Sequence, residues 1–116
     1  MAHPVIHFEI GCRDNQKAQE FYSKAFDWKM QSYGPAAMID TGIKAGINGH
    51  INSLGHEPHN YVLVYIQVDD IPKALDKISS LGGKTIVPAT PIPNYGEFAW
   101  FSDPEGNTIG LFRPQM

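Results

Sequence analysis

The segment that determines the fold is VIHFEIGCRD, residues 5–14, because a second segment of the same kind, YVLVYIQVDD, occupies residues 61–70. In both, apolar residues alternate with others, as in a strand that is covered on one face. Successive side chains of a strand point to opposite faces. The first segment therefore predicts a strand with Phe8 on one face and with His7 and Glu9 on the other.

A helical pattern follows each of these strands. In the first, Asp14 or Asn15 can cap the helix. Its apolar residues recur at helical spacing and comprise Ala18, Phe21, Tyr22, Ala25 and Phe26. In the second, Asp70 is the expected N-cap, Pro72 lies in the first turn and Gly82-Gly83 ends the helix. Its apolar stripe comprises Ile71, Ala74, Leu75, Ile78 and Leu81.

Short strands are expected after each helix, because glycine and proline break the remaining chain into brief apolar pieces. The polar stretch NSLGHEPHN, residues 52–60, is typical of a linker. A shift of 56 residues superposes Asp14 on Asp70 and Ala18 on Ala74. This register indicates an internal duplication. We therefore predict an α+β fold of two tandem βαβββ modules, about 1–52 and about 61–114, in a single domain over residues 1–116.

If each module covers one sheet face with its helix, the opposite faces are expected to enclose a central cleft. The residues expected on those faces are His7, Glu9, Tyr61, Leu63, Tyr65 and Gln67. Flat side chains with a polar edge suit a small planar or amphipathic ligand. An equally open alternative is that the tyrosines simply fill the space or form a dimer contact.

The composition is that of an ordinary globular protein, with 42% apolar and 18% charged residues. A net charge of −3 and the absence of a Lys/Arg cluster disfavour nucleic acid and anionic membranes as partners. The first residues resemble no signal peptide, so a cytoplasmic protein is the expectation. Cys12 is the only cysteine, and we expect a buried, inert thiol.

Three segments resemble the vicinal oxygen chelate superfamily, the group of glyoxalases, bleomycin resistance proteins and extradiol dioxygenases. They are IHFEIGCRDNQKAQEFYSKAFDW, YVLVYIQVDDIPKALDKISSLGGK and FSDPEGNTIGLF, of which the Asp-Pro-Glu-Gly turn at residues 103–106 is the most specific part. The resemblance implies paired βαβββ modules whose cleft often holds a divalent metal. It also implies that Tyr95 and Trp100 lie near the rim of that cleft.

In metal-dependent members of this superfamily, a histidine on the first strand and a glutamate on the last strand of each module supply the ligands. These positions fall on His7 and Leu63 for the histidines and on Asn48 and Gly110 for the glutamates, with His50 beside Asn48 on the same face. Leu63 and Gly110 offer no donor atom. The resemblance therefore implies an incomplete metal site; any Fe, Mn, Ni or Zn would be held by His7 with Asn48 or His50.

Three functions remain open from the sequence. The first is a protein that binds a small organic molecule in the cleft, with aromatic compounds among the candidates, and lacks the full family metal site. The second is a metal-dependent lyase or isomerase of the glyoxalase kind, or a ring-cleaving dioxygenase. The third is an interaction module with a filled cleft. A homodimer is expected, and no catalytic residue is assigned, since only His7 and Glu9 are acid or base candidates. The expected ligand-binding residues are His7, Glu9, Tyr61, Leu63, Tyr65, Tyr95, Trp100 and Gly110.

Overall fold

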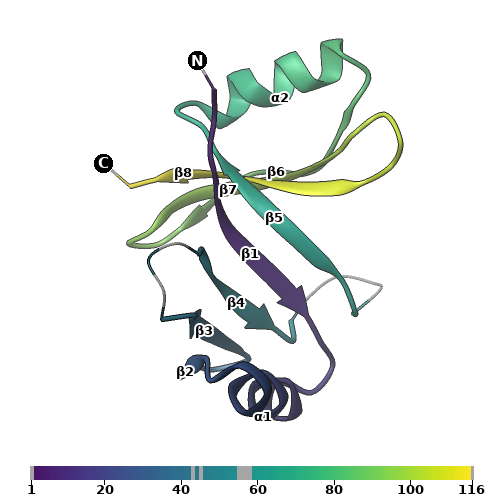
Figure 1. Ribbon diagram of the computed structural model, residues 1–116. Coiled ribbons are helices and arrows are strands. Elements are labelled where there is room, and N and C mark those ends of the chain that lie inside the picture. Colours follow the sequence, from purple (N-terminus) through teal and green to yellow (C-terminus); the bar gives the residue numbers. More distant parts are fainter. Residues whose placement is uncertain (1, 43, 45, 55–58, 116) are drawn as a thin grey trace. The chain divides into compact units, whose positions relative to one another are not determined.

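The computed structural model describes residues 2–42, 44, 46–54 and 59–115 (Figure 1). The described elements run in the order β1 (Val5–Gly11), α1 (Asn15–Phe26), β2 (Lys29–Tyr33), β3 (Ala36–Asp40), β4 (Asn48–Asn52), β5 (Val62–Gln67), α2 (Ile71–Ser80), β6 (Lys84–Ile92), β7 (Gly96–Ser102) and β8 (Thr108–Pro114). The predicted order, strand, helix and three strands, occurs twice. The α+β fold of two tandem βαβββ modules is thus confirmed.

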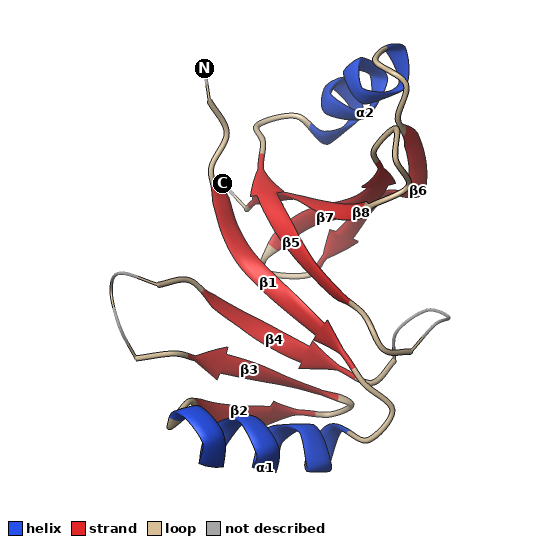
Figure 2. Cartoon of the chain, turned by 45° about the vertical axis from the view of Figure 1, so that its right-hand side comes forward, coloured by secondary structure: helices blue, strands red, loops and turns tan. Residues whose placement is uncertain are grey.

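The chain forms two compact units, of which one comprises residues 7–63. Its strands lie in the order β2-β3-β4-β1, with β1 parallel to β4 and the other neighbours antiparallel. Helix α1 covers one face of this sheet (Figure 2). The core under the helix contains Cys12, Ile39 and Ile51, packed against Phe8, Ile10, Ala18, Tyr22, Trp28 and Met30.

The other compact unit comprises residues 2–6 and 64–115. Its strand order is β5-β8-β7-β6, with β5 parallel to β8 and the other neighbours antiparallel. Its core is formed by Val68, Ile71, Leu75, Ala99 and Leu111. The enclosure of a cleft by the free faces of the two modules stays a prediction.

Both helices begin at an aspartate whose side chain accepts a backbone N–H of the first turn. Asp14 accepts from the Lys17 amide and Asp70 from the Lys73 amide, each at 3.0 Å. These bonds satisfy donors that a helix start leaves unpaired. Of the two cap candidates for α1, Asp14 is therefore the N-cap, and Asn15 is the first helical residue.

The apolar stripes of both helices are narrower than the spacing predicts. In α1, Ala18 and Tyr22 pack into the core, whereas Phe21 is 61% exposed, and Ala25 and Phe26 are exposed as well. In α2, Leu81 is exposed because the helix ends at Ser80, one residue before it. The helical spacing of apolar residues does not show which of them contact the sheet, and in α1 only one side of the apolar stripe does so.

The Asp-Pro-Glu-Gly segment is a turn held by the Asp103 side chain. Its carboxylate accepts hydrogen bonds from the side-chain amide of Asn107 and from the backbone amides of Asn107 and Glu105, each at 2.9 Å. These hydrogen bonds, the one from the Asn107 side chain first, lower the pKa of Asp103. Gly106 follows with φ +91°, a conformation that suits glycine. The most specific family motif in the chain is thus a structural turn between β7 and β8.

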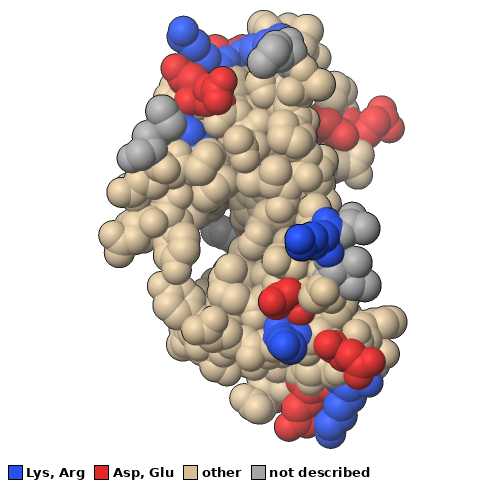
Figure 3. All heavy atoms as spheres, turned by 60° about the vertical axis from the view of Figure 1, so that its left-hand side comes forward, with Lys and Arg blue, Asp and Glu red and all other residues tan. Residues whose placement is uncertain are grey.

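No helix in the described part of the chain is long and apolar enough to cross a membrane. On the face drawn in Figure 3, basic and acidic side chains are interspersed over the surface. Such a face lacks the single-sign stripe that binds a phosphate backbone. Of the predicted linker, residues 55–58 lie outside the described residues.

Candidate functional site

The first module carries a polar cluster on the sheet face that α1 does not cover. Phe8 and Ile10 pack into the core beneath α1, so their strand neighbours His7 and Glu9 point to the opposite face. On the adjacent strand, His50 lies directly beside Glu9 in the parallel ladder. The alternation predicted for residues 5–14 therefore gives the correct faces.

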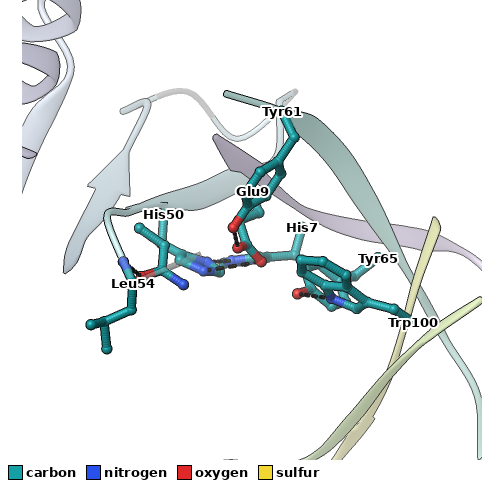
Figure 4. Close-up of polar contacts among 8 residues, drawn as sticks. His7, Glu9, His50, Leu54, Tyr61, Tyr65 and Trp100 are labelled. Atoms are coloured by element: carbon teal, nitrogen blue, oxygen red, sulfur yellow. Dashed lines mark hydrogen bonds and ion pairs between the residues drawn. The ribbon is translucent and has the colours of Figure 1, made fainter. Parts of the chain in front are cut away.

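Four side chains of this cluster form a continuous hydrogen-bonded chain (Figure 4). His7 Nε2 lies 2.7 Å from His50 Nδ1, and His50 Nε2 lies 3.3 Å from Glu9 Oε1. The Tyr61 hydroxyl donates a hydrogen bond to Glu9 Oε2. All four residues belong to the compact unit of residues 7–63. Two strands and the segment before β5 thus converge on one carboxylate.

The carboxylate of Glu9 is the buried centre of this cluster. Glu9 is only 2% exposed, whereas His7 and His50 are partly exposed. A buried carboxylate is costly unless it is paired and hydrogen-bonded, and Tyr61 and His50 supply both kinds of contact. The network therefore stabilises a charge that the sheet face alone could not hold.

The ionisation of the neighbouring side chains follows from this burial. The pKa of His7 is lowered to about 4, first by desolvation and then by repulsion from His50, although Glu9 opposes the shift. Burial and the hydrogen bond to Glu9 raise the pKa of Tyr61 well above its usual range. At neutral pH His7 is therefore a neutral imidazole and Tyr61 a phenol.

The donors in the chain can be assigned when each imidazole carries one proton. As a carboxylate, Glu9 only accepts, so His50 donates through Nε2 and accepts through Nδ1. His7 must then donate through Nε2 to His50. This fixes Nδ1 of His7 as an acceptor atom. With one proton on each ring, the cluster selects one tautomer of the partly exposed His7 imidazole.

Gly11 places Tyr61 within reach of Glu9. A Cβ atom at Gly11 would lie 2.2 Å from Cε2 of the Tyr61 ring, so only glycine leaves room for the ring there. The Gly11 amide also donates to the Tyr61 carbonyl at 2.8 Å. From the sequence alone, no role is predicted for Gly11. A glycine at the end of an otherwise apolar strand is the signal for such a close approach.

The corresponding position of the second module is apolar and filled. Tyr65 lies beside Gly110 in the β5–β8 ladder, as Glu9 lies beside His50 in the first module. A Cβ atom at Gly110 would lie 2.3 Å from the Tyr65 ring, which therefore occupies the place of a side chain at position 110. The Tyr65 hydroxyl accepts a 2.9 Å hydrogen bond from Trp100 Nε1. Both aromatic residues are buried, at 6% exposure each.

The remaining predicted ligand-binding residues differ in their surroundings. Leu63 is buried. Tyr95 is exposed in the turn between β6 and β7, where its carbonyl accepts a 2.8 Å hydrogen bond from the Gln115 amide. Tyr95 and the buried Trp100 therefore differ strongly in exposure, although the resemblance implied that both lie at a rim.

The two ladders identify which residue of the first module matches Gly110. Glu9 and Tyr65 are related by the 56-residue shift, and their ladder partners are His50 and Gly110. His50, and not Asn48, is thus the structural counterpart of Gly110. Asn48 is engaged elsewhere, because its side-chain oxygen accepts from the Thr41 amide at 2.9 Å and from the Thr41 hydroxyl at 3.1 Å.

The family's four-ligand metal arrangement does not fit these residues. Leu63 and Gly110 have no donor atom at two of the four positions. The facing nitrogens of His7 and His50 share a hydrogen bond, and Glu9 is held by Tyr61 and His50. Among the residues that the structure describes, no group of three or more His, Cys, Asp or Glu side chains could hold a metal ion.

Comparisons with known proteins support the resemblance. The chain is 30% identical over 116 residues to a glyoxylase-like domain-containing protein of Didymella fabae, covering 92% of this chain and 91% of that protein. It is 37% identical over 113 residues to CFP32 of Mycobacterium bovis, whose name assigns it to the glyoxylases. That match covers 90% of this chain but only 43% of CFP32, so the chain spans less than half of that relative.

A solved structure of a glyoxalase/bleomycin resistance protein/dioxygenase superfamily member from Vibrio splendidus has the same fold. It is 13% identical in sequence and superposes with a TM-score of 0.65, covering 98% of this chain and 100% of that one. The sequence pattern of the Glyoxalase/Bleomycin resistance protein/Dioxygenase superfamily matches residues 5–111. With nearly its whole length matched, this chain belongs to the Glyoxalase/Bleomycin resistance protein/Dioxygenase superfamily.

Proposed function

We propose that this protein binds a small organic molecule on the polar face of its first module and does so without the complete metal site of the family. The observation that carries the proposal is the partly exposed pair of His7 and His50, whose network includes the buried Glu9 and Tyr61. A connected polar cluster with a strongly shifted pKa is typical of a functional site.

The ionisation of His7 favours binding over acid–base chemistry. A general base works best when its pKa lies near the working pH. With a pKa of about 4, roughly one His7 side chain in a thousand is protonated at pH 7. A neutral imidazole of fixed tautomer is instead suited to hydrogen-bond a hydroxyl, carbonyl or carboxyl group of a ligand. We therefore expect a ligand with at least one such oxygen group.

The second module offers a different, aromatic surface, which we treat separately. Tyr65 and Trp100 are buried and bonded to each other, so a ligand that stacks on them must first displace part of this packing. Exposed Tyr95 needs no such change. We propose the polar face as the primary binding surface and these aromatic residues as a further contact surface. We also propose that the protein is cytoplasmic and forms a homodimer.

A second candidate function is a metal-dependent lyase or isomerase of the glyoxalase kind, or a ring-cleaving dioxygenase. The names of the two relatives at 30% and 37% identity favour it. The close approach of His7 and His50 also brings together two imidazoles, whose nitrogen atoms are common metal ligands. Leu63 and Gly110 oppose it. Whether metal is bound therefore separates the two candidates.

The test uses protein purified without chelators. Elemental analysis for Fe, Mn, Ni and Zn comes first, on the wild type and on His7→Ala. The Trp28→Phe variant then leaves Trp100 as the only tryptophan, and its fluorescence is followed during titration with catechol, phenol and benzyl alcohol. Calorimetric titration of the same compounds covers binding that does not reach Trp100.

Protein that contains less than about 0.1 metal per chain and binds a probe saturably, with weaker binding in His7→Ala and His50→Ala, supports the proposal. Tyr65→Ala and Tyr95→Ala report on the aromatic surface. Stoichiometric metal that His7→Ala loses would instead support the metal-dependent enzyme. Metal-free, folded protein that binds none of the probes contradicts both functions.

A further inference from the structure

The outer side of α1 combines exposed aromatic surface with charges of both signs. Helix α1 lies against the sheet of its own unit (Figure 2), and Tyr22 and Ala18 fill the interface. The opposite side exposes Phe21, of which 61% is accessible. An open depression around it is lined by Lys17, Glu20, Phe21, Lys24 and Ala25. An exposed apolar patch that is rimmed by polar residues is typical of an interaction site.

The charges along this side of α1 are arranged so that two copies of the helix, packed antiparallel, would place opposite charges next to each other. If two copies of α1 pack antiparallel about a two-fold axis at the level of Tyr22, each residue faces the one equally far on the other side of position 22. Glu20 then faces Lys24 of the second copy, and Lys17 faces Asp27. All four are exposed. A two-fold interface repeats each contact, so four opposite-charge pairs would surround the two Phe21 rings.

We propose that the outer side of α1 is a homodimer interface, in which Phe21 packs against the second copy and Glu20 pairs with Lys24 of that copy. A second copy is favoured over an unrelated partner because both halves of the charge pattern occur on this one helix. Helix α1 has 12 residues, about 18 Å, so the buried area is small. The dimer should be micromolar rather than nanomolar.

A charge-swap cycle tests this arrangement by sedimentation equilibrium from about 5 μM to 1 mM. Lys24→Glu and Glu20→Lys each place like charges across the interface, and each should weaken association at least about tenfold. The double variant E20K/K24E restores opposite charges and should return to within about threefold of wild type. Phe21→Asp should leave the protein monomeric over the same range.

Leu81→Asp is the matched control, because Leu81 is an exposed apolar residue at the end of the other helix. It should leave the association unchanged. Glu20 and Lys24 are also neighbours at i, i+4 within one helix, so the charge variants can change the stability of the helix itself. Circular dichroism at low concentration, where the protein is monomeric, distinguishes such an effect on folding from an effect on association. A wild type that stays monomeric to 1 mM overturns the proposal. So does a dimer that Phe21→Asp and the single charge variants leave intact.

Discussion

The imidazoles of His7 and His50 share a hydrogen bond of 2.7 Å, although 43 residues separate them in the sequence. His7 lies on β1 opposite Asn48, and His50 lies two residues further along the parallel strand β4, opposite Glu9. The contact joins the partly exposed His7 to the buried carboxylate of Glu9 through the His50 ring. A substitution of any one of these hydrogen-bonded side chains should therefore alter the hydrogen bonds of the others.

Stability should fall between about pH 6.5 and pH 4 because of His7. Its pKa is 6.5 as a model group and about 4 in the folded protein, so the unfolded chain binds the proton first. The stabilisation is complete above pH 6.5 and is lost as pH falls towards 4. The slope cannot exceed about 1.4 kcal/mol per pH unit. Solvent screening at a partly exposed side chain reduces the total to about 1–2 kcal/mol.

Urea denaturation at several pH values, on the wild type and on His7→Phe, measures this contribution. The variant should lose stability less steeply over the same pH range, because it carries no titrating ring at position 7. His7→Gln serves as a control that keeps a polar side chain. Parallel pH profiles for wild type and His7→Phe would show that His7 is not responsible.

Removal of the Tyr61 hydroxyl should destabilise the protein by about 1–3 kcal/mol, because a buried carboxylate loses a donor. Tyr61→Phe keeps the ring over Gly11 and removes only the hydrogen bond to Glu9. Tyr33→Phe is the matched control, since Tyr33 is exposed. Free energies of unfolding from urea titration compare the two. Equal stability of the two variants would contradict a stabilising role of the Tyr61–Glu9 bond.

Gly110→Ala should cost about 1–3 kcal/mol through overpacking, because its Cβ would lie 2.3 Å from the Tyr65 ring. Those nearest atoms belong to a side chain, so in a Tyr65→Ala background the same change should cost about 1 kcal/mol less. Gly49→Ala provides the contrast: its Cβ would lie 2.4 Å from the backbone oxygen of Phe8. In a Phe8→Ala background, Gly49→Ala should therefore cost nearly as much free energy of unfolding as it does in the wild type.

A double-mutant cycle by urea denaturation measures both couplings. The prediction is wrong if Gly110→Ala costs the same with and without the Tyr65 ring, or if the Gly49 pair shows the larger coupling.

The two N-caps should contribute equally, about 1 kcal/mol each. Asp14→Ala and Asp70→Ala remove the same 3.0 Å hydrogen bond from equivalent positions of the two modules. Asparagine keeps the accepting oxygen, so Asp14→Asn and Asp70→Asn should be nearly neutral. Thermal and urea unfolding of the four variants test this. An alanine variant as stable as its asparagine partner would mean that the cap bond does not stabilise that helix.

Much of the fold could be predicted from the sequence because local patterns carry it. Strand alternation gave the faces of β1, and Asp14 and Asp70 marked both helix starts. The burial of α1 could not be predicted in the same way. Phe21 fits the helical spacing, yet its exposure depends on where the sheet lies, which is a tertiary property.

The candidate site could be predicted only in part. His7 and Glu9 follow from alternation within one strand, but the contact with His50 requires the register of β1 against β4. The 56-residue shift places Gly110 on Leu54, four residues beyond His50, because the second module has four more residues between the two ladder partners. The register of the two ladders is therefore needed to identify His50, in place of Asn48, as the counterpart of Gly110. Gly11 has no side chain whose chemistry could indicate a function. The need for glycine at this position follows only from the packing of the Tyr61 ring against it.

The position of the Tyr65 ring over Gly110 also limits which substitutions this face of the second module tolerates. Any side chain at position 110 requires the tyrosine ring to move, and replacement of the tyrosine removes the hydrogen bond from Trp100. A donor side chain engineered at position 110 would therefore need a second, smaller side chain at position 65.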